Sequence, residues 1–486
     1  MNFNSLAFLI FLPVVLVAWR LIPPKYRWAE LLLASYVFYA WFNALLLIPI
    51  LAITCISYLS ARGMAAAETR GRKKALLAVT LIVCLGTLFV FKYLDFVVGL
   101  GYSIARLLGG DKVFSGFDII LPMGISFYTF QTLSYVIDVY RGTVPPEKHY
   151  GYYSLFVVFF PQLVAGPIER PQNLIPQLRD AKNPCAEDIS RGIRKLVIGF
   201  AKKVAVADFV GRFVDHAFGS AGSGGVAYAV ATALFAVQIY CDFSGYTDIA
   251  VGSARLLGIK LSENFDSPYR SASIREFWRR WHISLSSWLS DYLYKPLGGS
   301  RKGLARQCLN IFIVFLCSGL WHGASLNFAV WGLLHGGFMI VNTLYGAIKK
   351  KHKGLQKASE NIAYRIAAHA LTLFAVWFAW IFFRAGSLGD AAHIVTDIFT
   401  LSPAAGGSWL SGLGMTAGEI PVLAAMLVLL VAIERLPVID VNALPVKTKT
   451  YGGAILAYFA VIGIIAVMWL YALNSGGVGG FIYFRF

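Results

Sequence analysis

Residues 238–303 read QIYCDFSGYTDIAVGSARLLGIKLSENFDSPYRSASIREFWRRWHISLSSWLSDYLYKPLGGSRKG, and after a short apolar run residues 318–336 read SGLWHGASLNFAVWGLLHG. Two histidines in this part of the chain, His282 and His322, lie among Trp, Arg and apolar residues. The surrounding sequence is rich in apolar runs, and an ionisable side chain inside a membrane segment is costly in free energy. These two histidines are therefore the first candidates for a functional site.

The composition predicts a membrane protein. Hydrophobic residues make up 58% and charged residues 14% of the 486 residues, whereas soluble domains have roughly 25% charged residues; the mean hydropathy is +0.65. We expect an all-α, polytopic integral membrane protein with about eleven to thirteen transmembrane helices plus re-entrant and interfacial helices. The apolar runs cover residues 6–22, 29–42, 45–59, 75–91, 119–139, 196–218, 226–240, 309–320, 328–345, 366–383, 421–433 and 451–471.

Basic residues predict how the chain is oriented in the membrane. Arg20, Lys25 and Arg27 follow the first apolar run and none precedes it, which is typical of an uncleaved helix that enters from outside and not of a signal peptide. The positive-inside rule then places the N-terminus and the closing segment 476–486 outside. The same rule predicts cytoplasmic loops at residues 25–27, 62–74, 301–306, 349–353 and 447–449.

The net charge and the cysteines exclude several classes of protein. The net charge of +18 comes from 43 Lys and Arg against 25 Asp and Glu, and orientation together with contact with anionic membrane lipid accounts for it. We expect no nucleic-acid partner, because the basic residues are spread over many loops. The six cysteines form no CxxC pair and none has zinc-finger spacing to two histidines, so we expect neither a disulfide scaffold nor a metal site.

Two polar stretches interrupt the apolar texture in the middle of the chain. Residues 159–178 contain four prolines, which predict a segment that enters the membrane and turns back. Residues 238–248 end an apolar run with Gly245 as an expected break, and they predict either a polar pocket or an interfacial helix end. The polar residues of this second stretch are Gln238, Tyr240, Asp242, Ser244, Tyr246, Thr247 and Asp248.

Four arginines lie close to His282, namely Arg270, Arg275, Arg279 and Arg280. On a helix that starts near Ser273, Arg275 and Arg279 share one face, and Phe277 and Trp281 share another. This pattern predicts an amphipathic helix at the cytoplasmic interface. Its guanidinium groups suit either lipid headgroups or the phosphates of a soluble donor such as coenzyme A. No Walker or Rossmann glycine pattern occurs nearby, which disfavours a nucleotide-driven pump.

His322 has the most unusual setting of the eight histidines. It directly follows Trp321, and glycines lie on both sides of it. His335 is 13 residues further on, and on one unbroken helix the two side chains would lie roughly 20 Å apart along the axis, which disfavours a shared metal ion. Five further histidines, which we interpret as solvated or structural residues, are His149, His216, His352, His369 and His393.

These motifs carry a resemblance to a known family. The DFSGYTDIA (242–250), LSENFDSPYR (261–270), FWRRWHISLSSWL (277–289), DYLYKPLGG (291–299), SGLWHG (318–323) and WGLLHG (331–336) elements resemble the membrane-bound O-acyltransferase (MBOAT) family. The branch they resemble is that of the bacterial alginate O-acetylation membrane subunit. Similar elements occur at 31–41, 160–178 and 481–486, so the resemblance covers nearly the whole chain. Cys241 and Lys295 are small departures from the pattern.

The resemblance implies more than spacing does. It implies a single MBOAT-like membrane domain over residues 1–486, with a catalytic core at about 150–345 and helices around a central tunnel. It implies that His322 and His282 match the catalytic histidines and that His335 matches a less decisive position. It also implies a bacterial inner membrane, acetyl-CoA as cytoplasmic donor, no tightly bound cofactor, and a periplasmic SGNH-type acetyltransferase partner that serves a polysaccharide acceptor.

The chemistry of imidazole agrees with these roles. A hydroxyl that attacks a thioester must lose its proton in the transition state, and a neutral histidine is a suitable base. We expect His322 to be this base or an acyl-histidine nucleophile, and His282 to orient a substrate or to stabilise the oxyanion. We expect acetylation of an exopolysaccharide, alginate first. The alternatives are acylation of cellulose, peptidoglycan or teichoic acid, or a non-enzymatic glycan transporter, which the absence of paired inverted repeats disfavours.

Overall fold

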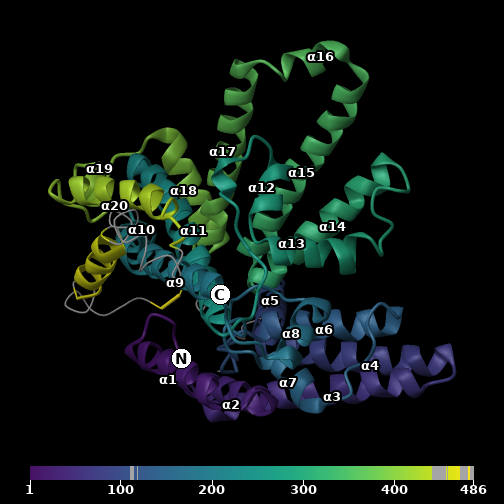
Figure 1. Ribbon diagram of the computed structural model, residues 1–486. Helices are drawn as coiled ribbons and strands as arrows, with labels where there is room; N and C mark the ends of the chain where they lie inside the picture. The colour runs from purple at the N-terminus through teal and green to yellow at the C-terminus, as the bar shows by residue number, and fades with distance from the viewer. Residues whose placement is uncertain (110–113, 118, 440–455, 457, 471–479, 482–486) are drawn as a thin grey trace. The chain divides into compact units, whose positions relative to one another are not determined.

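The computed structural model describes residues 1–109, 114–117, 119–439, 456, 458–470 and 480–481, and these consist of helices and loops with no β-strand among them (Figure 1). The described residues fall into two compact units. The first unit holds those of 1–197, 246–262 and 437–439, and the second holds those of 198–245, 263–436 and 456–481. The all-α prediction is confirmed for the described part of the chain.

The first unit consists of helices packed side by side. Its α-helices are α1 (Leu6–Leu21), α2 (Arg27–Ala40), α3 (Leu47–Ala66), α4 (Arg70–Leu88), α5 (Leu94–Leu107), α6 (Ile125–Arg141), α7 (Tyr150–Val158) and α8 (Pro171–Asp180). Shorter helical turns are η1 (Pro24–Tyr26), η2 (Ala44–Leu46) and the π-helix η3 (Phe89–Tyr93). Helices α3, α4 and α6 pack against one another, and α2 packs against α7 (Figure 1). The unit boundary passes through α9 (Ala186–Phe200) and α11 (Gly225–Leu256).

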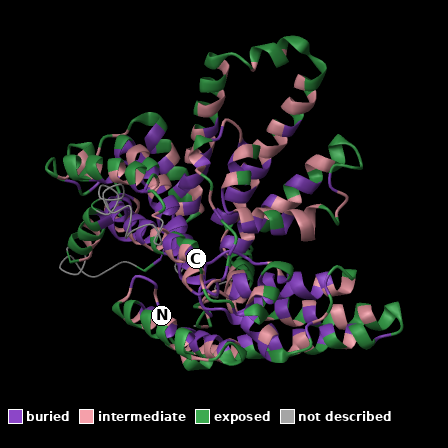
Figure 2. Ribbon diagram, in the orientation of Figure 1, coloured by how far each residue is buried: buried purple, intermediate pink, exposed green. Residues whose placement is uncertain are grey.

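The second unit contains both candidate catalytic histidines. Its α-helices are α10 (Asp208–Gly219), α12 (Ile274–Arg280), α13 (Ile283–Leu289), α14 (Leu304–His322), α15 (Leu326–Lys351), α16 (Lys353–Ala358), α17 (Ile362–Arg384), α18 (Leu388–Thr400), α19 (Trp409–Gly412), α20 (Glu419–Ile433) and Tyr458–Leu470. Shorter segments are the π-helices η4 (Ala201–Ala207) and η6 (Ser290–Tyr294) and the 3-10 turn η5 (Pro268–Arg270). Helix α15 packs against α14 and α17. Helix α16 is exposed (Figure 2). In contrast, His322 at the end of α14 is buried.

Six helical segments among the described residues are long and apolar enough to cross a membrane. They are Ala44–Ala66, Arg70–Leu107, Gly225–Leu256, Leu304–His322, Leu326–Lys351 and Ile362–Arg384. Shorter apolar helices, Leu6–Leu21, Glu419–Ile433 and Tyr458–Leu470, add to them. These features fit a multi-pass membrane protein, while the count of eleven to thirteen crossings stays a prediction. The basic loop at 447–449, part of the run at 451–471, and the closing segment 476–486 apart from Gly480 and Phe481 lie outside the described residues.

The proline-rich stretch 159–178 is helical in its second half only. Residues 159–170 form a buried, non-helical path, as the sequence predicts. The carboxylate of Glu169 is buried there; it accepts hydrogen bonds from the Ser262 N–H and from Asn173 Nδ2, the latter at 2.7 Å. Helix α8 then begins at Pro171 and contains Pro176. The prolines therefore do not keep the whole stretch out of a helix: Pro171 occupies the first turn of α8, where no intrahelical N–H bond is lost, and the helix accommodates Pro176 in its interior.

Helix α11 passes through Gly245 without interruption, so the predicted break is wrong. A Cβ at position 245 would lie 2.9 Å from the carbonyl oxygen of Gly199 and 3.2 Å from Lys202 Cβ. The glycine therefore permits close approach of the backbone of α9 within the second unit. The polar residues of 238–248 are buried along α11. This burial fits the prediction of a polar pocket better than the prediction of an interfacial helix end.

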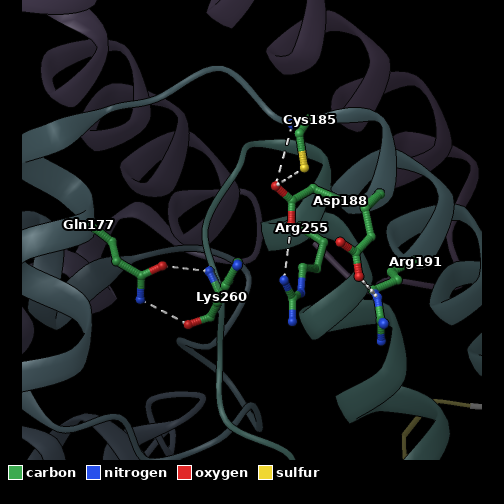
Figure 3. Close-up of polar contacts among 7 residues, drawn as sticks. Gln177, Cys185, Asp188, Arg191, Arg255 and Lys260 are labelled. Carbon is green, nitrogen blue, oxygen red and sulfur yellow. Dashed lines mark hydrogen bonds and ion pairs between the residues drawn. The ribbon is translucent and has the colours of Figure 1, made fainter. Parts of the chain in front are cut away.

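Polar contacts hold the last turn of α11 in the first unit (Figure 3). Arg255 donates to Asp188 Oδ1 at 3.0 Å, and the Cys185 thiol donates to Asp188 Oδ2 at 3.1 Å. Burial raises the pKa of Asp188, but the hydrogen bonds from Cys185 and Arg255 outweigh burial, so the pKa lies below the ordinary value of a carboxyl. Beyond the helix, the backbone N–H of Lys260 donates to Gln177 Oε1 at 2.8 Å, and its carbonyl accepts from Gln177 Nε2 at 3.0 Å (Figure 3).

Candidate active site

A tight helical hairpin positions His322. Helix α14 ends at His322, Gly323 and Ser325 have extended backbones, and α15 begins at Leu326. The two helices meet at Gly319 and Gly332, because a Cβ on Gly319 would lie 2.2 Å from the carbonyl oxygen of Phe328 and 3.1 Å from the Cα of Gly332. Backbone contact of this kind is typical of helix pairs with small residues at their crossing.

The imidazole of His322 lies in an aromatic box. Its ring centroid is 5.0 Å from that of Trp331 on α15 and 5.4 Å from that of Phe383 on α17. The neighbouring Trp321 ring lies at 5.0 Å. The residue is buried, and edge-to-face contacts fix the orientation of its ring. An imidazole held in this way meets the first requirement of a general base, which is a fixed position.

His282 lies next to His322, with 6.4 Å between the ring centroids. It is fully buried in the turn between α12 and α13, and its ring contacts Phe243 at 4.7 Å between centroids. Its backbone is left-handed, at φ 46° and ψ 54°, a conformation that costs roughly 1–2 kcal/mol in a residue with a Cβ. The structure thus brings together the two histidines that the sequence singles out, 40 residues apart.

Burial keeps His282 neutral. Desolvation lowers its pKa to about 3, against a smaller opposing effect of its own backbone hydrogen bond. At neutral pH a neutral imidazole presents one N–H and one lone pair, so it can donate a hydrogen bond without carrying charge. Since the unfolded chain binds a proton near pH 6.5 and the folded chain does not, this residue contributes stability that is present above pH 6.5 and is lost as the pH falls toward about 3.

His335 belongs to the same aromatic cluster. Its ring centroid is 4.9 Å from that of Trp331, which also contacts His322. The indole N–H of Trp278 donates to His335 Nδ1 at 3.3 Å. The hairpin break therefore brings His322 and His335 to one tryptophan, which the spacing along an unbroken helix could not predict. The described residues contain no cluster of three or more His, Cys, Asp or Glu side chains suited to a metal ion.

The four predicted donor-binding arginines differ in their surroundings. Helix α12 starts after Ser273, whose side chain caps it, as predicted. Arg280 is bound by Glu276 at 2.9 Å and lies 3.7 Å from Asp266, and Arg275 donates to Thr343 Oγ1 at 3.0 Å. Arg270 and Arg279 are exposed, and the guanidinium group of each makes no hydrogen bond or ion pair within the part of the chain that the structure describes. These two are the arginines available to an anionic ligand.

The second unit also contains a buried ion cluster that the sequence did not lead us to expect. Lys203 on the π-helix η4 donates to Asp242 Oδ1 at 2.6 Å and pairs with Asp208 Oδ1 at 2.7 Å. It also donates to the carbonyl of Gly480 at 3.0 Å and lies 4.7 Å from the ring centroid of Phe481. In the sequence, two adjacent lysines inside the apolar run 196–218 could have indicated this ion cluster.

Apolar helices of membrane-spanning length indicate a multi-pass membrane protein, and its second unit brings two buried histidines together. Residues 147–366 match the model of MBOAT, the membrane-bound O-acyltransferase family. The chain is 37% identical over 411 residues to a probable alginate O-acetylase of Pseudomonas syringae pv. tomato, covering 82% of this chain and 75% of the relative.

Two further relatives show how the family varies. A peptidoglycan O-acetyltransferase of Helicobacter pylori is 35% identical over 434 residues, covering 82% of this chain and 80% of that protein. A teichoic acid D-alanyltransferase of Bacillus subtilis is 28% identical over 254 residues, covering 49% and 63%. The chain belongs to the membrane-bound O-acyltransferase family, and it is an O-acyltransferase.

Proposed function

We propose that the protein transfers acetyl groups from cytoplasmic acetyl-CoA for O-acetylation of an exopolysaccharide, alginate first, outside the bacterial inner membrane. The observation that carries this proposal is the pair of buried histidines with ring centroids 6.4 Å apart. The similarity to probable alginate O-acetylases over 82% of the chain supports the choice of polymer. We assign the catalytic core to residues 150–345, around a central tunnel in which donor and acceptor meet.

In the proposed reaction, His322 accepts the proton of the acceptor hydroxyl while the hydroxyl oxygen bonds to the thioester carbonyl carbon. The C–S bond then breaks, and coenzyme A leaves as a thiolate that takes up the proton from His322. The acetyl ester remains on the acceptor. The neutral N–H of His282 is suited to stabilise the oxyanion of the tetrahedral intermediate. An acyl-histidine relay is the alternative order of bond formation at His322.

The acceptor is tested in an alginate-producing Pseudomonas host that lacks its own membrane O-acetylase. Expression of this chain should restore acetyl esters on purified alginate, and the His322→Gln variant should not. Proteoliposomes supplied with acetyl-CoA and with alginate oligosaccharides as acceptor, assayed for release of the coenzyme A thiol, test donor use independently of the host. No acetyl ester on alginate together with thiol release would contradict alginate as acceptor.

Peptidoglycan is the second candidate acceptor. The Helicobacter pylori peptidoglycan O-acetyltransferase matches this chain over as much of its length as the alginate relative does. Acetyl esters on peptidoglycan but not on alginate in the same host would support it. We also propose a periplasmic SGNH-type acetyltransferase as partner, and its removal from the host should abolish polymer acetylation.

Arg279 should contribute to donor binding more than Arg280 does. A charge-assisted hydrogen bond to a phosphate is worth about 1.5–3 kcal/mol, so Arg279→Gln should raise the KM for acetyl-CoA roughly tenfold or more and leave kcat nearly unchanged. Arg280→Gln should act more weakly because Glu276 already binds that guanidinium. The exposed Lys357→Gln on α16 is the control for lost positive charge. An unchanged KM in Arg279→Gln would return the arginine to a role at lipid headgroups.

The proposed direction of transfer requires the basic loops to be cytoplasmic and the N-terminus to be periplasmic. In a variant without native cysteines, a single cysteine at position 300 should resist a membrane-impermeant thiol reagent in intact cells, and one at position 475 should react. Permeabilised cells give the control in which position 300 also reacts. Labelling of position 300 from outside would place the arginine face of α12 away from cytoplasmic acetyl-CoA and would contradict the mechanism.

A further inference from the structure

The chain segment before the arginine helix runs beside the turn that holds His282. The N–H of Asp266 donates to the carbonyl of Arg280 at 3.0 Å, just before His282. The N–H of Ile283 donates to the carbonyl of Asn264 at 3.0 Å, just after it. Hydrogen bonds on both sides of His282 therefore clamp the turn, and all of these residues belong to the second unit.

Asn264 also uses its side chain in this clamp. Among the described residues, it is the only side chain of the clamp that hydrogen-bonds to the backbone after His282. Its Oδ1 accepts a hydrogen bond from the Ser284 N–H at 3.1 Å. Together with the Ile283 bond, Asn264 satisfies the first two N–H groups of α13, which a helix cannot satisfy internally. His282 stands at the N-cap position of α13, and its side chain makes no cap hydrogen bond.

The backbone geometry explains why an external cap is needed. His282 is left-handed, and a residue with a Cβ adopts this conformation only where its surroundings outweigh the cost. Asn264 is fully buried, and its Nδ2 has no hydrogen-bond partner among the described residues.

We infer that Asn264 is a positioning residue for His282, holding the left-handed turn that aims the imidazole toward His322. This inference rests on the proposed function, in which His282 stabilises the reacting carbonyl. Asn264 acts through the backbone of Ile283 and Ser284 and is not itself placed on the substrate. No motif spacing points to it, because its partners lie 19 and 20 residues further along the chain.

The test measures acetyl transfer from acetyl-CoA to alginate oligosaccharides by variants reconstituted in proteoliposomes. Asn264→Ala should lower kcat by up to about 100-fold, the loss expected from a displacement of about 1 Å at a reacting centre, with little change in the KM for acetyl-CoA. Asn264→Asp keeps the acceptor oxygen and should retain more activity than Asn264→Ala. In a His282→Gln background, Asn264→Ala should cause no further loss of kcat.

Asn310 provides a matched control for loss of stability. It is also a fully buried asparagine, and its Nδ2 donates to the carbonyl of Gly299 at 2.9 Å. Asn310→Ala should lower the unfolding temperature but retain nearly full activity per folded molecule. Equal losses of activity in Asn264→Ala and Asn310→Ala would overturn the inference, as would multiplicative losses in the double variant. If His282→Gln had wild-type activity, both the proposed role of His282 and this inference would be overturned. If His282→Gln were defective but Asn264→Ala were fully active, only this inference would be overturned.

Discussion

Replacement of His322 by alanine is expected to abolish acetyl transfer while the protein remains in the membrane. The change removes the proton acceptor, and loss of a general base costs roughly a hundredfold to ten-thousandfold in rate. His322 is buried among Trp331, Phe383 and Trp321, so alanine also leaves a cavity. His322→Gln keeps most of the side-chain volume and separates the loss of chemistry from the loss of packing.

The measurement is release of the coenzyme A thiol in proteoliposomes, with acetyl esters on the polymer as a second readout. His335→Ala is the matched control, because His335 contacts the same Trp331 ring as His322. It should be milder than His322→Ala. Equal losses in the two variants would point to a relay that uses both imidazoles, and near-normal transfer by His322→Gln would remove His322 from the proposed chemistry.

The sequence predicts the chemical groups of this site better than their geometry. A histidine between Trp321 and Gly323 and another after Trp281 stand out in an apolar chain, since each is costly to bury. The arginine helix could also be predicted. Ser273 is a good N-cap, and Phe277 lies at a position that fits the helical spacing of apolar residues. Such local signals predicted α12, the burial of His282 and His322, and the all-helical fold.

Features that depend on a distant partner could not be predicted in the same way. Gly245 looks like a helix break in sequence, but it is the point where α11 meets the backbone of Gly199. Lys203 looks like an unpaired charge in an apolar run, but Asp242 neutralises it from 39 residues away. Asn264 lies in the LSENFDSPYR element, but only the left-handed backbone of His282 gives its side chain a role.

Replacement of Gly332 by valine is expected to separate α14 from α15 and to destroy the site. A Cβ at this position would lie 2.3 Å from the carbonyl oxygen of Phe315 and 3.1 Å from the Cα of Gly319. Overpacking commonly costs about 1–3 kcal/mol when side chains can move aside. Here the obstructing atoms are backbone, so the helices must move apart, and the neighbouring Trp331 must leave the ring of His322.

Gly337→Val on the same helix is the control, since nothing lies within 4 Å of a Cβ built there. It carries the same change in helix propensity, about 0.5 kcal/mol or less, and should be nearly silent in membrane abundance, unfolding temperature and acetyl transfer. Gly332→Val should lose transfer and most of its folded protein. If both variants transferred acetyl groups equally well, close contact of the α14 and α15 backbones would be unnecessary for positioning His322. The aromatic box alone would then have to hold the imidazole, and substitution of Trp331 by alanine would have to cost as much as substitution of His322 itself.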